Sequence, residues 1–252
     1  MLLIEFLGTK EYVGKKESLE GKAETAPLKE SIGALFQNKY AVVIALMQFF
    51  ALFINTMGST AQVYYCNNVL QAPGMIAMLL AAGSILGMVG MIFMPAILKK
   101  WNKRTLLTVG AVLMVIGYFM TGAYGTNTAV LMAACALRGV GIAWLMQGIV
   151  AFSADIADYG EWKTGLRTEG LINSAGSVGV KVGVGLGSAI VTWVLALGGY
   201  VGTAEVQTES ALTVIKFSFG YLPAIASVIL MVVCLFMDVE KYHNEVHKAI
   251  EK

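Results

Sequence analysis

Four acidic and two basic residues are concentrated in one short block of an otherwise apolar chain. The block reads "DIADYGEWKTGLRTEG" (155–170), and its acids are Asp155, Asp158, Glu161 and Glu169. Grouped carboxylates can act as general acids and bases, bind a metal ion, or form ion pairs with nearby lysines and arginines. Which chemistry applies depends on where the flanking segments place the block, because catalytic carboxylates need a pocket that perturbs their pKa values.

A second candidate is Lys181, a single basic residue well inside a long apolar run. A charge in hydrocarbon is costly unless it is paired or hydrated, so Lys181 either contacts an ion or substrate or pairs with a carboxylate on a neighbouring helix. At helical spacing, its face also carries the hydroxyl groups of Ser174, Ser177, Ser188 and Thr192. Gly179, Gly183 and Gly187 fall nearly opposite Lys181 and predict the close approach of another helix.

Three amides form another polar stripe inside an apolar run. Gln48, Asn55 and Gln62 recur at heptad spacing and therefore lie nearly in line on a helix. Amide groups in hydrocarbon need hydrogen-bond partners. This stripe predicts either hydrogen bonds between helices or the lining of a cavity.

Arg138 is the charged residue of a further apolar run, and two polar or aromatic residues follow it on an adjoining helical face. These two residues are Trp144 and Gln147. An arginine at this position either contacts an anionic group or extends its guanidinium toward the outer membrane surface. Both possibilities remain open from the sequence.

The segments that carry these residues are expected to be membrane-spanning helices. The chain has 252 residues, 57% hydrophobic and 13% charged, and its mean hydropathy is +0.71. A soluble domain has about 25% charged residues. A helix needs about 20 apolar residues to cross about 30 Å of hydrocarbon. We expect six such helices, at about 41–65, 74–98, 105–125, 128–153, 171–197 and 212–237.

The charges in the connections predict the orientation of these helices. Most of the 18 lysines and arginines lie in residues 1–39, 99–104, 155–170 and 239–252, whereas the connections at 66–74, 122–128 and 197–210 contain none. Under the positive-inside rule, both ends and the acidic block are cytoplasmic. The chain then divides into a cytoplasmic segment (1–39), a six-helix transmembrane bundle (40–238) and a cytoplasmic tail (239–252).

The acidic block, followed by Lys181, resembles the signature of a transporter family. "ADIADYGEWKTGLRTEG" (154–170) is similar to that of the glycoside–pentoside–hexuronide:cation symporters, the melibiose-carrier branch of the major facilitator superfamily. Three shorter stretches resemble the end of that family's sixth helix, its central loop and the end of its next helix. They are "FLGTKE" (6–11), "PLKESIGALFQNKY" (27–40) and "YY" (64–65).

The resemblance implies a half-length transporter. Members of the family have two six-helix halves, and this chain is similar only to the second half, so the family's acidic cation site and most of its sugar contacts would lie outside it. Lys181 corresponds to the lysine that faces the cation and sugar site. Gly176 and Ser177 stand where the melibiose carrier has an amide and a hydroxyl, which leaves the substrate open. The predicted cation and sugar site comprises Lys181, Trp144, Ser177 and Gln147, and the cavity-lining candidates are Gln48, Asn55 and Arg138.

Orientation and resemblance together predict that the acidic block is a gate at the cytoplasmic mouth. Its carboxylates are expected to pair with bases of the 99–104 connection, with Arg167, or with a missing half, and such pairs break as a transporter rocks between its two states. The predicted gate consists of Asp155, Asp158, Tyr159, Glu161, Arg167 and Glu169. The alternative is a solvated loop of surface pairs, each worth under about 1 kcal/mol.

The sequence therefore predicts an all-α integral membrane protein that resembles the C-terminal half of a major facilitator superfamily transporter. Its expected function is symport of a sugar or glycoside with Na⁺, H⁺ or Li⁺ by alternating access in the cell membrane, with an N-terminal half that is encoded separately or lost. We expect no enzymatic activity, cofactor, metal site or nucleic-acid partner. The alternatives are a carrier of an organic anion or lysolipid, a membrane-embedded enzyme that uses Asp155, Asp158 and Glu161, and an inactive remnant.

Overall fold

The computed structural model describes residues 33, 35–165, 169–204 and 206–242, and Arg167 of the predicted gate lies outside this part of the chain. Within it, the backbone is helical and contains no strand, which confirms the predicted all-α class. The helices are α3 (Lys39–Tyr64) with the π-helix η1 (Tyr65–Val69), α4 (Met75–Leu98), α5 (Lys103–Tyr124), α6 (Thr128–Thr164), α7 (Glu169–Leu197), α8 (Glu209–Phe219), α9 (Tyr221–Leu235) and the 3₁₀ turn η2 (Val239–Tyr242).

Six helical segments are long and apolar enough to cross a membrane, as expected. The fourth helix, however, does not end near residue 153: α6 continues through most of the acidic block to Thr164. Gly165 then ends α6 in the left-handed conformation, with φ of 72°, which glycine adopts without a steric penalty. Asp155 and Asp158 are therefore neighbours on one helical face rather than residues of a loop.

The sixth span is interrupted at Gly220, between α8 and α9. Pro223 lacks the N–H that would bond to the carbonyl of Phe219, which weakens the helix at this point. A side chain at Gly220 would also collide with the backbone of Gly122 in α5. The interruption lets α5 pass close to the break.

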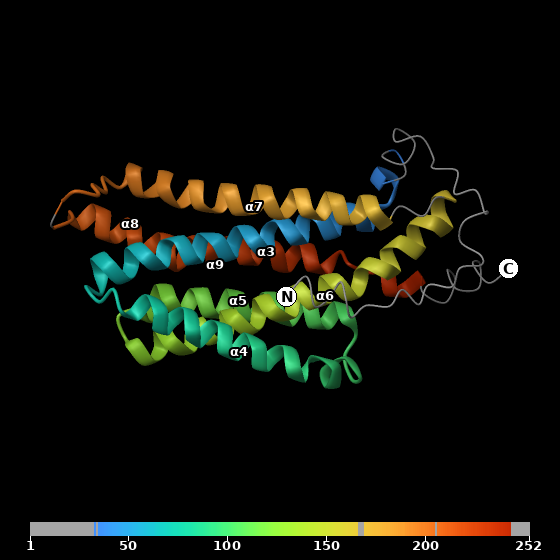
Figure 1. The fold of residues 1–252 in the computed structure, drawn as a ribbon, viewed down its shortest axis with the longest axis horizontal. Helices are drawn as coiled ribbons and strands as arrows, with labels where there is room; N and C mark the ends of the chain where they lie inside the picture. Colours follow the sequence, from blue (N-terminus) through green and yellow to red (C-terminus); the bar gives the residue numbers. More distant parts are fainter. Residues whose placement is uncertain (1–32, 34, 166–168, 205, 243–252) are drawn as a thin grey trace, which may run out of the picture.

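The helices are arranged so that α4 and α7 lie at opposite edges of the bundle (Figure 1). Helix α7 packs mainly on α3, and α4 packs mainly on α6. Helices α5 and α9 contact each other, with α5 also against α6 and α9 also against α3. As a result α4 and α7 are the least buried of the candidate spans and expose many large apolar side chains, as expected for surfaces that face lipid or another protein.

Close approach at both edges depends on glycine. A Cβ at Gly183 of α7 would lie 2.5 Å from the carbonyl oxygen of Phe49 in α3, and one at Gly179 would lie 2.8 Å from that of Ala45. The predicted glycine ridge therefore does face a neighbouring helix. At the other edge, a Cβ at Gly139 of α6 would overlap the carbonyl oxygen of Gly83 in α4. Small residues let these backbones touch, which is how membrane helices maximise their packing.

Candidate functional site

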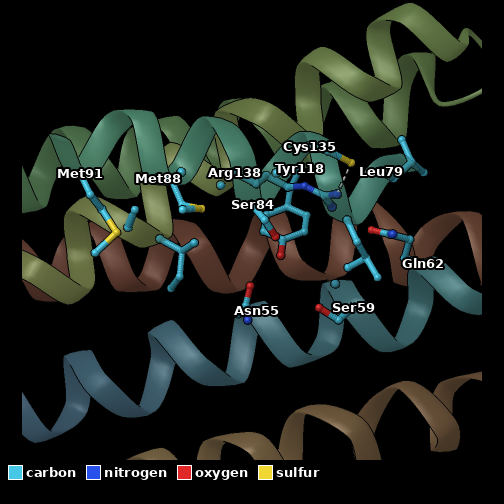
Figure 2. Close-up of a pocket in the computed structure, with 17 residues that line it drawn as sticks. Asn55, Ser59, Gln62, Leu79, Ser84, Met88, Met91, Tyr118, Cys135 and Arg138 are labelled. Atoms are coloured by element: carbon cyan, nitrogen blue, oxygen red, sulfur yellow. Dashed lines mark hydrogen bonds between the residues drawn. The ribbon is translucent and has the colours of Figure 1, made fainter. Parts of the chain in front are cut away.

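A cavity of about 320 Å³ lies between α3, α4 and α6, beside Arg138. Figure 2 shows Asn55, Ser59 and Gln62 of α3 and Ser84 of α4 around the cavity, with the guanidinium of Arg138 directed toward Cys135. Asn55, Ser59 and Ser84 are exposed, so the cavity opens to the surface of the bundle. Polar side chains on two helices therefore converge within apolar spans, as in sites that bind small molecules.

Arg138 is the one charged residue among those that line this cavity, and it is 9% exposed. Its Nη2 donates to Cys135 Sγ at 2.7 Å. The guanidinium carbon lies 4.6 Å from the ring centroid of Tyr118 and 5.1 Å from that of Phe219. Its Nη1 has no hydrogen-bond partner in the described part of the chain. Of the two possibilities left open by the sequence, extension to the outer surface does not match this position, because the side chain lies between two rings inside the bundle.

This environment leaves the charge of Arg138 incompletely compensated. A buried, charged donor without a partner costs about 1–3 kcal/mol or more, whereas a cation–π contact contributes about 2 kcal/mol when desolvated. A weak thiol acceptor adds little to that contribution. The two rings hold the guanidinium in place, but they supply no negative charge.

Residues on the neighbouring helices α3 and α5 fix the position of the Arg138 side chain. Gly117 of α5 packs against Arg138, where a Cβ would lie 2.6 Å from the arginine Cγ. The Tyr118 hydroxyl donates to the carbonyl of Ile54 in α3 at 3.1 Å, which fixes the ring beneath the guanidinium. Gly58 of α3 leaves room for that hydroxyl, because a Cβ there would collide with it. Three helices thus determine the position of one charge.

The amide stripe on α3 has two roles rather than one. Gln62, 4% exposed, donates its amide to the carbonyl of Ile76 in α4 at 3.3 Å and also lines the cavity. Asn55 lines the cavity and is exposed. Gln48 lies outside the cavity, and its side chain sits directly over Gly176 of α7, where a Cβ would collide with it. Both possibilities left open by the sequence, hydrogen bonding between helices and cavity lining, are therefore found.

Lys181 and Ser177 lie on a different surface from the cavity. Both are exposed on the face of α7 that points away from its glycine contact with α3. The Ser177 hydroxyl donates to the carbonyl of Asn173 at 2.9 Å, within its own helix. Neither residue lines the cavity beside Arg138. The structure does not bring Lys181 and Arg138 together within this chain.

Trp144 and Gln147 lie on α6 but do not line the cavity either. The indole N–H of Trp144 donates to the carbonyl of Gly90 in α4 at 3.0 Å, and its ring meets that of Trp101 edge-on with centroids 6.4 Å apart. Gln147 is half-buried. The hydrogen-bonding group of Trp144 is therefore engaged in joining α4 to α6.

The acidic block lies at the end of the bundle that also carries the lysines and arginines of residues 99–104. We call this end, formed by residues 99–104 and the last turns of α6, the basic end. The expected ion pair with the 99–104 connection is present, since Lys103 Nζ lies 2.6 Å from Asp155 Oδ2. Asp158 and Glu161 are half-buried on α6, and Glu169 is exposed in the first turn of α7. Tyr159 is buried against Tyr40, with ring centroids 4.9 Å apart.

Sequence reasoning missed several contacts that hold the basic end together. Asn38 is fully buried: its Oδ1 caps α3 by accepting from Tyr40 N and Ala41 N, and its Nδ2 donates to the carbonyl of Ile156 at 2.9 Å. Arg104 forms an ion pair with Asp238. An asparagine directly before an apolar helix is a recognisable N-cap signal, whereas the ion pair joins residues too far apart in the chain to be read from spacing.

No group of three or more metal-ligating side chains occurs within the residues that the structure describes. The half-buried acids on α6 accordingly do not form a metal centre with other described histidines, cysteines or acids. Among the described residues, Arg138 is the one charged group that is deeply buried, and it lies beside an open cavity. A charged, buried group beside an open, polar cavity can bind a solute within the membrane.

Comparison with known proteins is consistent with this description. The chain matches a family described as MFS/sugar transport protein over residues 1–241. It is 26% identical to the isoprimeverose transporter of Lactiplantibacillus pentosus, over all of this chain and 52% of that protein. It is 28% identical to a glucuronide carrier protein homolog of Escherichia coli, over 78% of this chain and 43% of that protein.

A third relative is the inner membrane symporter YicJ of Escherichia coli, 26% identical over 83% of this chain and 46% of that protein. The chain thus spans about half the length of the curated relatives it matches. The matched region covers the acidic block, Lys181 and the Arg138 cavity. With six apolar helices that are long enough to span a bilayer, the chain is a multi-pass membrane protein, and it belongs to the major facilitator superfamily of sugar transporters.

Proposed function

We propose that this chain is the C-terminal half of a cation-coupled sugar or glycoside symporter that works by alternating access. The observation that carries the proposal is the family match along residues 1–241, combined with a length about half that of the relatives. Transporters of this superfamily bind substrate between two six-helix halves. A second six-helix half would complete the site.

The two poorly buried edge helices support this arrangement. Helices α4 and α7 each pack on one main neighbour and leave their other faces exposed. Lys181 and Ser177 lie on such an exposed face of α7. We propose that Lys181 lies at the site of the coupling cation, which is Na⁺, H⁺ or Li⁺. In the same proposal, Ser177, Gln147 and Trp144 contact the sugar. The ring of Trp144, rather than its engaged N–H, would then meet the sugar.

The proposed orientation places the basic end in the cytoplasm, with both termini on that side of the cell membrane. The connections at the opposite end contain no lysine or arginine. Within this orientation, the Lys103–Asp155 pair and the neighbouring acids of α6 form part of a cytoplasmic gate whose contacts differ between the two states of the transporter. The relatives are transporters, and we propose that this chain likewise has no catalytic role.

A carrier of a non-sugar organic anion is the second candidate. The observation that favours it is the buried guanidinium of Arg138, which faces an open cavity and whose Nη1 has no hydrogen-bond partner among the described residues. This candidate would be supported over the first if the protein took up an anion that contains no sugar ring and if glycosides did not compete with that uptake. An inactive remnant is the third, and it predicts no uptake under any condition.

Uptake measurements with a supplied N-terminal half test the proposal. The chain is co-expressed with the six-helix N-terminal half of the isoprimeverose transporter in cells that lack glycoside uptake, and accumulation of labelled glycosides is followed with and without Na⁺. We expect cation-dependent uptake from the two halves together and none from either half alone. Uptake that is absent with both halves present and correctly inserted would contradict the proposal.

A further inference from the structure

We propose that the end of α4 and the connection that follows it bind an anionic phospholipid. The site comprises Lys99, Lys100 and Trp101, together with the exposed apolar face of the last turns of α4. The juxtaposition that carries the inference is two exposed lysines, unpaired among the described residues, directly after an apolar helix at an edge of the bundle (Figure 1). The site lies on the outer surface, takes no part in the proposed gate and does not depend on the transported solute.

The first step is the charge balance of the connection at 99–104, which contains four basic residues. Two of them, Lys103 and Arg104, form ion pairs with acids of α6 and of the segment after α9. Lys99 and Lys100 are exposed, and their side chains form no ion pair or hydrogen bond with any residue that the structure describes. Two positive charges at the basic end therefore remain available to a ligand.

The second step is the depth of these two lysines in the bilayer. Helix α4 contains 24 residues and no charged side chain. At 1.5 Å per residue it is about 36 Å long, which exceeds the hydrocarbon thickness of about 30 Å. Lys99 and Lys100 directly follow its last residue. They are therefore expected at the level of the lipid headgroups, where phosphate groups lie.

The third step is the apolar face that continues from the lysines toward the middle of the membrane. Ile92 and Phe93, about two turns before Lys99, are 74% and 60% exposed. Met88, one turn further, is also exposed. An acyl chain can pack along this face while its headgroup meets the lysines. A soluble phosphate or an acidic peptide would use the lysines and leave the apolar face uncovered.

The fourth step is the tryptophan beside the lysines. The exposed ring of Trp101 meets that of Trp144 edge-on, with centroids 6.4 Å apart. Trp144 is in turn hydrogen-bonded to Gly90 of α4, so the Trp101 ring is held where α4 meets α6. Its indole N–H donates to no residue in the described part of the chain. Indoles at the membrane interface place the ring among acyl chains and the N–H among polar groups.

The charge of the headgroup follows from the two unpaired lysines. Lysines near a membrane surface attract anionic lipids, and each contributes about fivefold in affinity. In a zwitterionic lipid, the positive group of the headgroup opposes this attraction. The site should therefore prefer a lipid with a net negative headgroup, such as phosphatidylglycerol, over phosphatidylcholine with the same acyl chains.

Native mass spectrometry of the purified full chain in detergent tests this inference. Dissociation constants are measured for dioleoyl phosphatidylglycerol and dioleoyl phosphatidylcholine, which differ only in the headgroup. We expect phosphatidylglycerol to bind more tightly by on the order of tenfold, from two lysines. Glycerol 3-phosphate, which has the phosphate without acyl chains, should not displace the lipid at a hundredfold excess.

Variants assign the preference to the proposed residues. Replacing both lysines, as Lys99→Gln with Lys100→Gln, should abolish the preference for phosphatidylglycerol, whereas Lys99→Arg with Lys100→Arg should retain it. Ile92→Ser should weaken both lipids by a similar factor. Lys216→Gln, which removes an exposed lysine of α8, is the control and should leave both affinities unchanged. Because the two lysines have no described partners, their replacement should not lower the unfolding temperature.

Equal affinity of the native chain for the two lipids would overturn the inference. A preference that persists in the double glutamine variant would overturn it as well, because the anionic lipid would then bind elsewhere on the chain. Displacement of the lipid by glycerol 3-phosphate at a similar concentration would indicate a site for a soluble phosphate instead. Each of these results would leave the proposed transport function intact.

Discussion

Lys103 and Asp155 join the start of α5 to the last third of α6 through an ion pair of 2.6 Å. The two side chains are 32% and 19% exposed, and Lys103 Nζ also donates to the carbonyl of Ala151 at 3.2 Å. The backbone N–H of Lys103 donates to Glu240 as well. One residue of the 99–104 connection therefore holds three segments together at the basic end.

If this pair contributes to a gate, removing either partner should change the rate of transport more than substrate affinity. A pair worth about 1 kcal/mol shifts a two-state equilibrium about fivefold. We expect Lys103→Met and Asp155→Asn each to alter the maximal uptake rate several-fold, and the double variant to be no worse than either single variant. Lys100→Met, which removes an exposed lysine of the same connection, is the control and should have little effect. Additive losses in the double variant would show that the two residues do not act as a pair.

The contact between α7 and α3 predicts a sharp contrast between two glycines of one helix. A Cβ at Gly183 would press on the backbone of Phe49, whereas nothing lies within 4 Å of a Cβ at Gly185. Overpacking typically costs about 1–3 kcal/mol. Gly183→Val should therefore lower the unfolding temperature in detergent, and Gly185→Val should not. Equal unfolding temperatures for the two variants would contradict the described contact between α7 and α3.

Trp144 offers a test that separates packing from sugar binding. Trp144→Phe keeps an aromatic ring but leaves the carbonyl of Gly90 without its donor. We therefore expect the free energy of unfolding to fall by about 1 kcal/mol, with little change in the substrate concentration for half-maximal uptake. Trp144→Ala removes the ring too, and should raise the substrate concentration for half-maximal uptake several-fold if the predicted sugar contact is correct. An unchanged half-saturation in Trp144→Ala would restrict Trp144 to packing.

Lys181 is the residue on which the predicted coupling depends. Its exposed position on α7 suits contact with another half, and losing one charge-assisted contact reduces binding by on the order of tenfold. Lys181→Ala should therefore remove the dependence of uptake on the cation while the protein still inserts in the membrane. The control is Lys216→Ala on α8, which should keep that dependence. Unchanged, cation-dependent uptake in Lys181→Ala would exclude Lys181 from the coupling site.

Much of this architecture could be predicted because membrane spans are encoded by composition. Continuous apolar runs fixed the number of helices and most of their bounds, since unpaired backbone groups cannot be left in hydrocarbon. The glycine spacing on α7 also predicted which of its faces packs closely on a neighbouring helix, and the structure identifies that neighbour as α3. The extension of α6 to Thr164 could not be predicted by hydropathy, because those turns are polar and leave the apolar run. The break at Gly220 depends on Pro223 and on contact with α5.

The candidate site was less predictable, because it depends on which faces meet in space. The spacing identified Arg138 and Asn55 as polar residues in apolar helices, but it did not show that they line one cavity or that Tyr118 and Phe219 enclose the guanidinium. Those rings come from α5 and α8, whose positions relative to α6 depend on helix packing. Conversely, Lys181 and Trp144 were grouped by resemblance, whereas within this chain they lie on separate surfaces.

Gradient-driven accumulation in proteoliposomes tests the central claim most directly. Vesicles that contain this chain, the N-terminal half, or both are loaded with buffer, and uptake of labelled glycoside is measured after an inward Na⁺ or H⁺ gradient is imposed. The account predicts accumulation above the external concentration only when both halves are present, and its collapse when the gradient is dissipated. Accumulation by this chain alone would contradict the account. Uptake by both halves that depends on neither the Na⁺ gradient nor the H⁺ gradient would contradict it as well.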